Sequence, residues 1–184
     1  ASVTGVLIGA PARAAGPAST NAAAPPMITR PIPTTGERLP VIGCGTYVGF
    51  DVARDSAQYQ RLPGVLQALF GAGGAVIDSS PMYGRAEAVT GELLAAAGSH
   101  GKAFVATKVW TRGRAEGIRQ MEESLRRLQV ERLDLMQIHN LVDWQTQLAT
   151  LRDWKGAGRV RYLGVTHYTA GAYDALETVM RTEA

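Results

Sequence analysis

The sequence predicts an α/β fold of the (β/α)8 TIM-barrel class, in which parallel strands and helices alternate along the chain. From residue 27 onward, short apolar runs rich in Val, Ile and Leu alternate with longer segments of helical spacing, with a period of about 30 residues. Such alternation is typical of a parallel sheet with right-handed crossovers. The first run ends in Gly43-Cys44-Gly45-Thr46-Tyr47 and lacks the third glycine of a Rossmann fingerprint. A barrel is therefore favoured over an open doubly wound sheet.

The individual elements follow from local patterns. A short hairpin is expected first, with arms at 28–32 and 38–39 around the turn signal Thr35-Gly36. The strands are expected where apolar runs lack polar alternation, which suits burial on both faces: 41–47, 75–79, 103–109, 133–139 and 162–166. The helices are expected where apolar residues recur at helical spacing: 62–70, 87–97, 117–128, 145–154 and 171–182.

These elements make about five βα units, whereas a complete barrel has eight units in roughly 250 residues. Residues 27–184 are therefore predicted to be the N-terminal part of a barrel that is incomplete at its C-terminal end. Five strands cannot close, so the edge strands of the chain by itself would expose unpaired backbone groups.

Residues 1–26 have a different composition, rich in Ala, Pro, Gly and Ser and almost without charge. A short apolar run at 3–10 is followed by Ala12-Arg13-Ala14, the small-x-small pattern of a signal-peptidase site. One interpretation is a partial signal peptide, which would send the protein to the periplasm. The other is a disordered leader on a cytoplasmic protein.

Composition excludes several function classes. The net charge of +3 is small and scattered, so no nucleic-acid partner is expected. Cys44 is the only cysteine, which rules out an internal disulfide and makes a cysteine metal site improbable; no metal is expected. No apolar run approaches the roughly 20 residues that span a bilayer, so no membrane insertion is expected.

Polar side chains stand at or just after the ends of most predicted strands: Asp78 with Tyr83 five residues later, Lys108, His139, and Thr166 with His167. The carboxyl ends of barrel strands converge at one face, so these side chains are expected close together. Each has a structural alternative, such as helix capping for the aspartate or snorkelling for the lysine. Lys108 lies inside an apolar run, where a charge needs a partner, and Asp78 on the neighbouring strand is the obvious one.

This grouping suits carbonyl reduction, which needs a hydride donor and an acid for the developing alkoxide. A free tyrosine has a pKa near 10, and a nearby ammonium favours the phenolate and lowers that pKa. An imidazole can hydrogen-bond the carbonyl oxygen and orient it. No side chain donates hydride, so a nicotinamide cofactor is expected.

Four segments resemble the aldo-keto reductase family in order and spacing: 74–84, extended by Glu87 and Gly91, then 105–110, 124–128 and 133–139. The resemblance covers about residue 28 to the end. It implies that Tyr83 is the general acid, that Lys108 lowers its pKa, that Asp78 pairs with Lys108, and that His139 orients the carbonyl. The family also closes the bottom of its barrel with a hairpin.

The resemblance further implies NADPH (NADP+) as cofactor and a small-molecule carbonyl as substrate. Thr46, Tyr47 and Asp78 match positions near the nicotinamide ribose. Thr166 and His167 stand where the family often has Ser-Asn, which holds the nicotinamide carboxamide.

Three aromatic residues, Phe50, Trp110 and Trp144, stand where the wall of an apolar substrate pocket could form. They are equally compatible with ordinary core or rim positions.

Two alternatives to an active NADPH-dependent reductase stay open. One is a cofactor-binding regulatory subunit on the same fold, which would need no acid. The other is an inactive truncated fragment.

Overall fold

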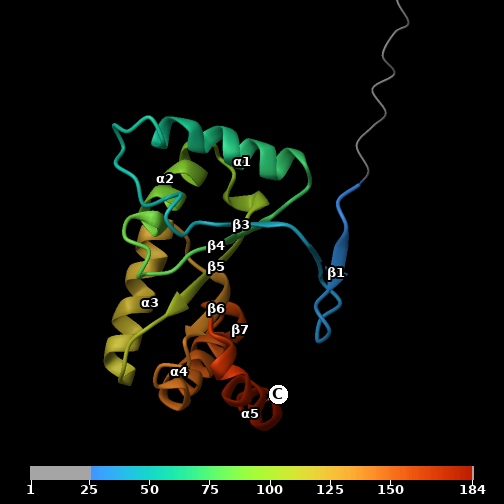
Figure 1. Ribbon diagram of the computed structural model, residues 1–184, viewed down its shortest axis with the longest axis vertical. Helices are drawn as coiled ribbons and strands as arrows, with labels where there is room; N and C mark the ends of the chain where they lie inside the picture. The colour runs from blue at the N-terminus through green and yellow to red at the C-terminus, as the bar shows by residue number, and fades with distance from the viewer. Residues whose placement is uncertain (1–25, 184) are drawn as a thin grey trace, which may run out of the picture.

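The computed structural model describes residues 26–183. Five parallel strands form one sheet in sequence order: β3 (Gly43–Gly45), β4 (Val76–Asp78), β5 (Phe104–Val109), β6 (Leu133–His139) and β7 (Val160–Thr166). A helix follows each strand: α1 (Leu62–Gly71), α2 (Ala86–Ala96), α3 (Arg114–Leu128), α4 (Trp144–Gly156) and α5 (Tyr173–Glu183). The predicted alternation is confirmed, and these five βα units form part of a (β/α)8 barrel (Figure 1).

The predicted hairpin is also present. Strands β1 (Thr29–Pro31) and β2 (Arg38–Pro40) pair antiparallel. Gly36 has a positive φ of 73° in the turn between them, a conformation that glycine adopts without strain. Three short 3-10 helices complete the described elements: Tyr59–Arg61, His100–Lys102 and Ala170–Ala172. The leader proposed for residues 1–26 lies outside the described residues apart from Pro26, so it stays a prediction.

The bounds of the first barrel strand differ from the prediction. The expected strand 41–47 contracts to Gly43–Gly45. Val41, at the apolar start of the expected strand, is hydrogen-bonded to the hairpin segment instead: its N–H donates to the Ile28 carbonyl at 3.0 Å. Beyond its end, the chain turns at Val48, which has a φ of 60°.

Burial varies across the sheet. Every residue of the central strand β5 is buried, as expected for a strand covered on both faces. Strand β7 is only half-buried over most of its length, and β3 is mostly exposed. The prediction that all five strands are buried on both faces is therefore wrong for β3 and β7. They stand at the two edges of the described sheet, where each has a single neighbour.

The hairpin docks at the amino-terminal end of the strands. The Glu37 carboxylate forms an ion pair with Arg161 and accepts a hydrogen bond from the Tyr162 hydroxyl at 2.5 Å. Arg161 also pairs with Asp134 at 2.6 Å, and the same aspartate accepts the Val105 N–H at 2.8 Å. This polar cluster lies at the starts of β5, β6 and β7, at the end opposite their carboxyl termini.

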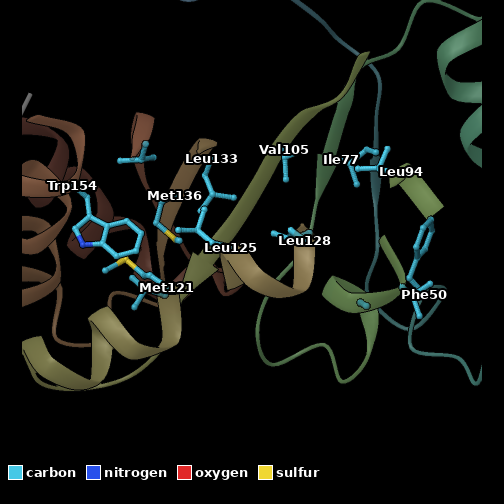
Figure 2. Packing of buried hydrophobic residues seen from close by; sticks show 14 of the residues in the cluster. Phe50, Ile77, Leu94, Val105, Met121, Leu125, Leu128, Leu133, Met136 and Trp154 are labelled. Atoms are coloured by element: carbon cyan, nitrogen blue, oxygen red, sulfur yellow. The ribbon is translucent and has the colours of Figure 1, made fainter. Parts of the chain in front are cut away.

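The hydrophobic core lies between the sheet and the helices that surround it. Figure 2 shows Trp154 and Met121 toward one end of this cluster and Phe50 at the other, with strand residues such as Val105 between them. Gly91 allows α2 to pack closely against α3, since a Cβ added there would lie 2.2 Å from the Arg127 carbonyl oxygen.

Among the described helices, none is long and apolar enough to cross a membrane.

Candidate active site

The carboxyl ends of β4, β5 and β6 bring three of the predicted catalytic side chains to the same end of the sheet. Asp78, Lys108 and His139 stand on these strands, and Tyr83 lies in the loop between β4 and α2. About 30 residues separate each strand-borne group from the next, so the parallel topology alone brings them together.

Asp78 and Lys108 form the central ion pair. The Lys108 Nζ donates to Asp78 Oδ2 at 2.6 Å and to the Ser79 carbonyl oxygen at 2.6 Å. A buried ammonium is tolerated only when it is paired and hydrogen-bonded, and both conditions are met here. The predicted pairing of these two residues is therefore observed.

Tyr83 packs between a cation and a second aromatic ring. Lys108 Nζ lies 5.0 Å from the centroid of the Tyr83 ring, and the Tyr47 ring lies 4.9 Å away at an interplanar angle of 56°. The loop that carries Tyr83 is fixed from outside, because the Asp51 carboxylate accepts the Arg85 N–H at 3.0 Å. The phenol is thus held beside the ammonium on an ordered loop.

The pKa of Tyr83 differs from the expectation. Burial raises it above its usual value, and the negative charge of Asp78 and the neighbouring Tyr47 raise it further. These effects outweigh the lowering expected from Lys108, whose ammonium donates to Asp78 and Ser79. The phenol is accordingly held in its protonated form, the form that can donate a proton.

His139 is buried at the end of β6. Burial lowers the pKa of its imidazole, and the positive charge of Lys108 lowers it further. Its Nδ1 has no hydrogen-bond partner among residues 26–183. A neutral imidazole at this position has one nitrogen that donates and one that accepts, so it can orient a polar group without carrying charge.

Two contributors to the site were missed from the sequence. Gln137 on β6 donates from Nε2 to Asp78 Oδ1 at 3.1 Å. Ser79 supplies its carbonyl to Lys108, and its hydroxyl lies 2.9 Å from the Thr46 Oγ1. Gln137 carried a usable signal, since a polar amide inside the run 133–139 needs a partner just as Lys108 does.

The two residues predicted near the nicotinamide ribose have different surroundings. Thr46 is fully buried, with its hydroxyl 3.1 Å from the Asp78 carbonyl oxygen. Tyr47 is 68% exposed and covers Tyr83. Thr46 therefore fixes the end of β3 against β4, whereas Tyr47 presents its ring at the surface of the site.

Thr166 and His167 follow at the end of β7, and both are half-buried. The Thr169 N–H donates to His167 Nδ1 at 3.2 Å, so a neutral imidazole carries its proton on Nε2. This leaves a ring N–H donor and a threonine hydroxyl at the strand end, a donor set that fits a carboxamide oxygen.

The three aromatic candidates separate clearly. Phe50 is 3% exposed and belongs to the hydrophobic core, so the core alternative describes its position. Trp144 is half-buried at the start of α4 and packs against the same core. Trp110 is 41% exposed just after β5, and Gln120 holds its backbone through the Trp110 N–H at 2.6 Å and its carbonyl at 3.3 Å.

Within the described chain, no group of three or more His, Cys, Asp or Glu side chains is arranged to hold a metal ion.

The sequence of this chain is similar to those of known proteins. Residues 41–183 match the model of the Aldo/keto reductase family. The chain is 33% identical over 135 residues to methylglyoxal reductase YeaE of Escherichia coli (strain K12), covering 70% of this chain and 46% of that protein. It is 26% identical over 163 residues to aldo-keto reductase YhdN of Bacillus subtilis (strain 168), covering 80% and 49%. The chain thus spans about half the length of these curated relatives.

Solved structures agree with the sequence comparison. An aldo-keto reductase from Klebsiella pneumoniae in complex with NADPH matches with a TM-score of 0.66 and 30% identity, over 78% of this chain and 51% of that chain. A structure of an aldo/keto reductase from the same organism with NADP and acetate has a TM-score of 0.65 and 30% identity, over 77% and 50%. These structural relatives hold a nicotinamide cofactor.

Proposed function

Because the chain belongs to the aldo/keto reductase family, we propose that the protein containing it reduces aldehydes or ketones to alcohols with NADPH. The observation that carries this proposal is the cluster at the carboxyl end of the sheet: the Asp78–Lys108 ion pair, with Tyr83 and the buried His139 beside it. A cofactor-binding regulatory subunit needs no proton donor, so the presence of all four groups favours an enzyme.

The proton comes from Tyr83 in this proposal. Burial and the nearby carboxylate keep the phenol protonated, and charge builds up on the substrate oxygen as the carbonyl is reduced. Lys108 stands 5.0 Å from the ring and stabilises the phenolate once the proton has left. Asp78 keeps the ammonium in place through the 2.6 Å ion pair.

His139 orients the carbonyl in the same step. Its lowered pKa keeps the imidazole neutral near neutral pH, so it directs the substrate oxygen by hydrogen bonding and does not compete with Tyr83 as an acid.

When bound, NADPH supplies the hydride that no side chain can provide. Thr166 and His167 would hold the carboxamide through their donors. Tyr47 and Asp78 would lie beside the ribose, and the buried Thr46 would fix the end of β3 against β4 next to them. Of the aromatic candidates, Trp110 has the exposure that a substrate-contacting residue needs, followed by the half-buried Trp144; Phe50 would act from behind the pocket wall.

The test is a comparison of Tyr83→Phe with the parent in the full-length gene product. NADPH oxidation is followed with small carbonyls, beginning with methylglyoxal, the compound in the name of the E. coli relative. The variant is expected to lose turnover by roughly 10²–10⁴-fold, the usual contribution of a general acid, while cofactor binding by fluorescence titration is unchanged. Tyr173→Phe, at an exposed tyrosine at the start of α5, is the matched control. Near-normal turnover by Tyr83→Phe would remove the acid from the proposal.

A further inference from the structure

We infer that Gln137 is a positioning residue of this site, which fixes the rotation of the Asp78 carboxylate so that one oxygen binds Gln137 and the other binds Lys108. This inference rests on the proposed function. It assigns a role to a side chain on β6 that lies beside the tyrosine, lysine, aspartate and histidine without being one of them.

The two oxygens of Asp78 have separate partners. Oδ2 accepts from Lys108 Nζ at 2.6 Å, and Oδ1 accepts from Gln137 Nε2 at 3.1 Å. An ionised carboxylate only accepts hydrogen bonds, so the glutamine must present its NH2 group here. The two donors come from neighbouring strands and fix the rotation of the carboxylate.

The backbone holds Gln137 in place for this contact. It pairs in register with Lys108 on β5 and with Gly164 on β7. A Cβ added at Gly164 would lie 3.2 Å from the Gln137 Cγ, so the missing side chain leaves room for the amide. A polar side chain inside a buried strand needs a partner, and the Asp78 carboxylate is the partner that it has.

The contact matters because, without Gln137, Asp78 Oδ1 would accept a hydrogen bond from a different donor. The donors within reach are water, since 36% of the Asp78 side chain is exposed, and the third N–H of Lys108. The other two N–H groups of Lys108 donate to Asp78 Oδ2 and the Ser79 carbonyl. A second hydrogen bond from Lys108 to Asp78 would draw the ammonium away from the phenol. With the ammonium further away, the pKa of Tyr83 rises and proton donation slows.

The pKa of Tyr83 also depends on the other groups that surround its phenol. Tyr47 faces Tyr83 from the loop after β3, Asp78 and Lys108 face it from β4 and β5, and the His139 imidazole lies on β6 within range of the charges of that pair. Gln137 carries no charge, so its removal changes the geometry of the carboxylate without changing the net charge of the site.

The decisive experiment measures the pKa of Tyr83 directly in the full-length protein. Phenolate absorbance is titrated for the parent and for Gln137→Leu, and each curve is corrected with its Tyr83→Phe counterpart. We expect Gln137→Leu to raise the pKa by about one unit, at the lower end of the shifts caused by a nearby charge. We also expect kcat to fall roughly tenfold or more, because a poorer proton donor loses part of a 10²–10⁴-fold contribution. An unchanged pKa would overturn the inference.

A second variant keeps the shape of the side chain and guards against loss of folding. Gln137→Glu places a second carboxyl group beside Asp78, which cannot donate when ionised but can donate when protonated. Its kcat is therefore expected to rise toward the parent value as the pH is lowered, whereas that of Gln137→Leu is not. Parallel pH profiles of the two variants would contradict a positioning role. Gln145→Leu and Gln145→Glu, on the exposed face of α4, are the matched controls.

The titration separates this inference from the proposed function. If the parent reduces no carbonyl, the proposed function fails, but the phenolate titration of Gln137→Leu still supports or overturns the positioning role because it needs no turnover.

Discussion

Asp78 and Lys108 are paired across neighbouring strands at 2.6 Å, and the two side chains are unequally buried, with 36% of the aspartate and 5% of the lysine exposed. Water can reach the carboxylate from one side, whereas the ammonium depends on protein oxygens. The lysine therefore needs its partner more than the aspartate does. This asymmetry leads to a difference between the two single substitutions.

Asp78→Asn is expected to destabilise the fold more than Lys108→Met. The first leaves a buried ammonium without a counter-ion, at a cost approaching the 3–5 kcal/mol known for broken buried pairs, lowered to about 2–3 kcal/mol because the Ser79 carbonyl remains. The second leaves a carboxylate that water can solvate. Urea unfolding of the full-length variants measures the difference. Equal losses, or a larger loss for Lys108→Met, would show that burial does not govern this pair.

The stability of the protein is expected to fall on acidification because of His139. Its pKa in the folded state lies below the usual value of 6.5, so the unfolded chain binds this proton more tightly. The corresponding stability is fully present above pH 6.5 and is lost as the pH falls through the lowered pKa of the folded state.

His139→Gln is expected to flatten the curve of unfolding free energy against pH below 6.5, since it removes the titrating group. The measurement is denaturant unfolding at a series of pH values. His100→Gln, a substitution at a second histidine on the connection to β5, controls for loss of an imidazole elsewhere. A curve for His139→Gln with the slope of the parent would refute the assignment.

Gly91→Ala is expected to destabilise the contact between α2 and α3. The added Cβ would lie 2.2 Å from the Arg127 carbonyl oxygen and 2.7 Å from the Leu128 carbonyl carbon, both backbone atoms that cannot rotate away. Overpacking of this kind costs about 1–3 kcal/mol.

Gly64→Ala in α1 is the matched control, because nothing lies within 4 Å of its added Cβ. There the higher helix propensity of alanine is expected to raise stability, by up to about 1 kcal/mol. Thermal unfolding of both variants checks the pair. If the two substitutions have the same effect, helix propensity and not the close approach of α2 and α3 decides the outcome at Gly91.

Most of the fold could be predicted because the strands are short, apolar and parallel. The bounds of β6 were predicted to the residue, since a mainly apolar run without regular polar alternation is typical of a buried strand. Strand β7 begins at Val160, two residues earlier than expected. The sequence did not predict this start, because a charged residue such as Arg161 is unusual in a buried apolar strand. That charge is satisfied by Asp134 and Glu37, two partners from distant parts of the chain.

The candidate site was predictable where a residue type is unusual in its surroundings. Lys108 stands out because a cation in an apolar run needs a counter-ion, and the pairing with Asp78 followed from strand order. The direction of the Tyr83 pKa did not follow, because it depends on where the ammonium points and on burial of the phenol. Phe50 could not be assigned, since a pocket wall and a core have the same composition.

The attachment of the hairpin to β7 has a consequence for how the chain folds as it is made. Glu37 meets Arg161 and Tyr162, which lie 124 and 125 residues further along the sequence. At about 5–20 residues per second, the ribosome delivers these partners roughly 6–25 s after the hairpin itself. The hairpin, the earliest β structure among the described residues, is therefore among the last elements to dock. This long-range contact forms at the amino-terminal end of the strands only after the five strands of the described sheet have been made.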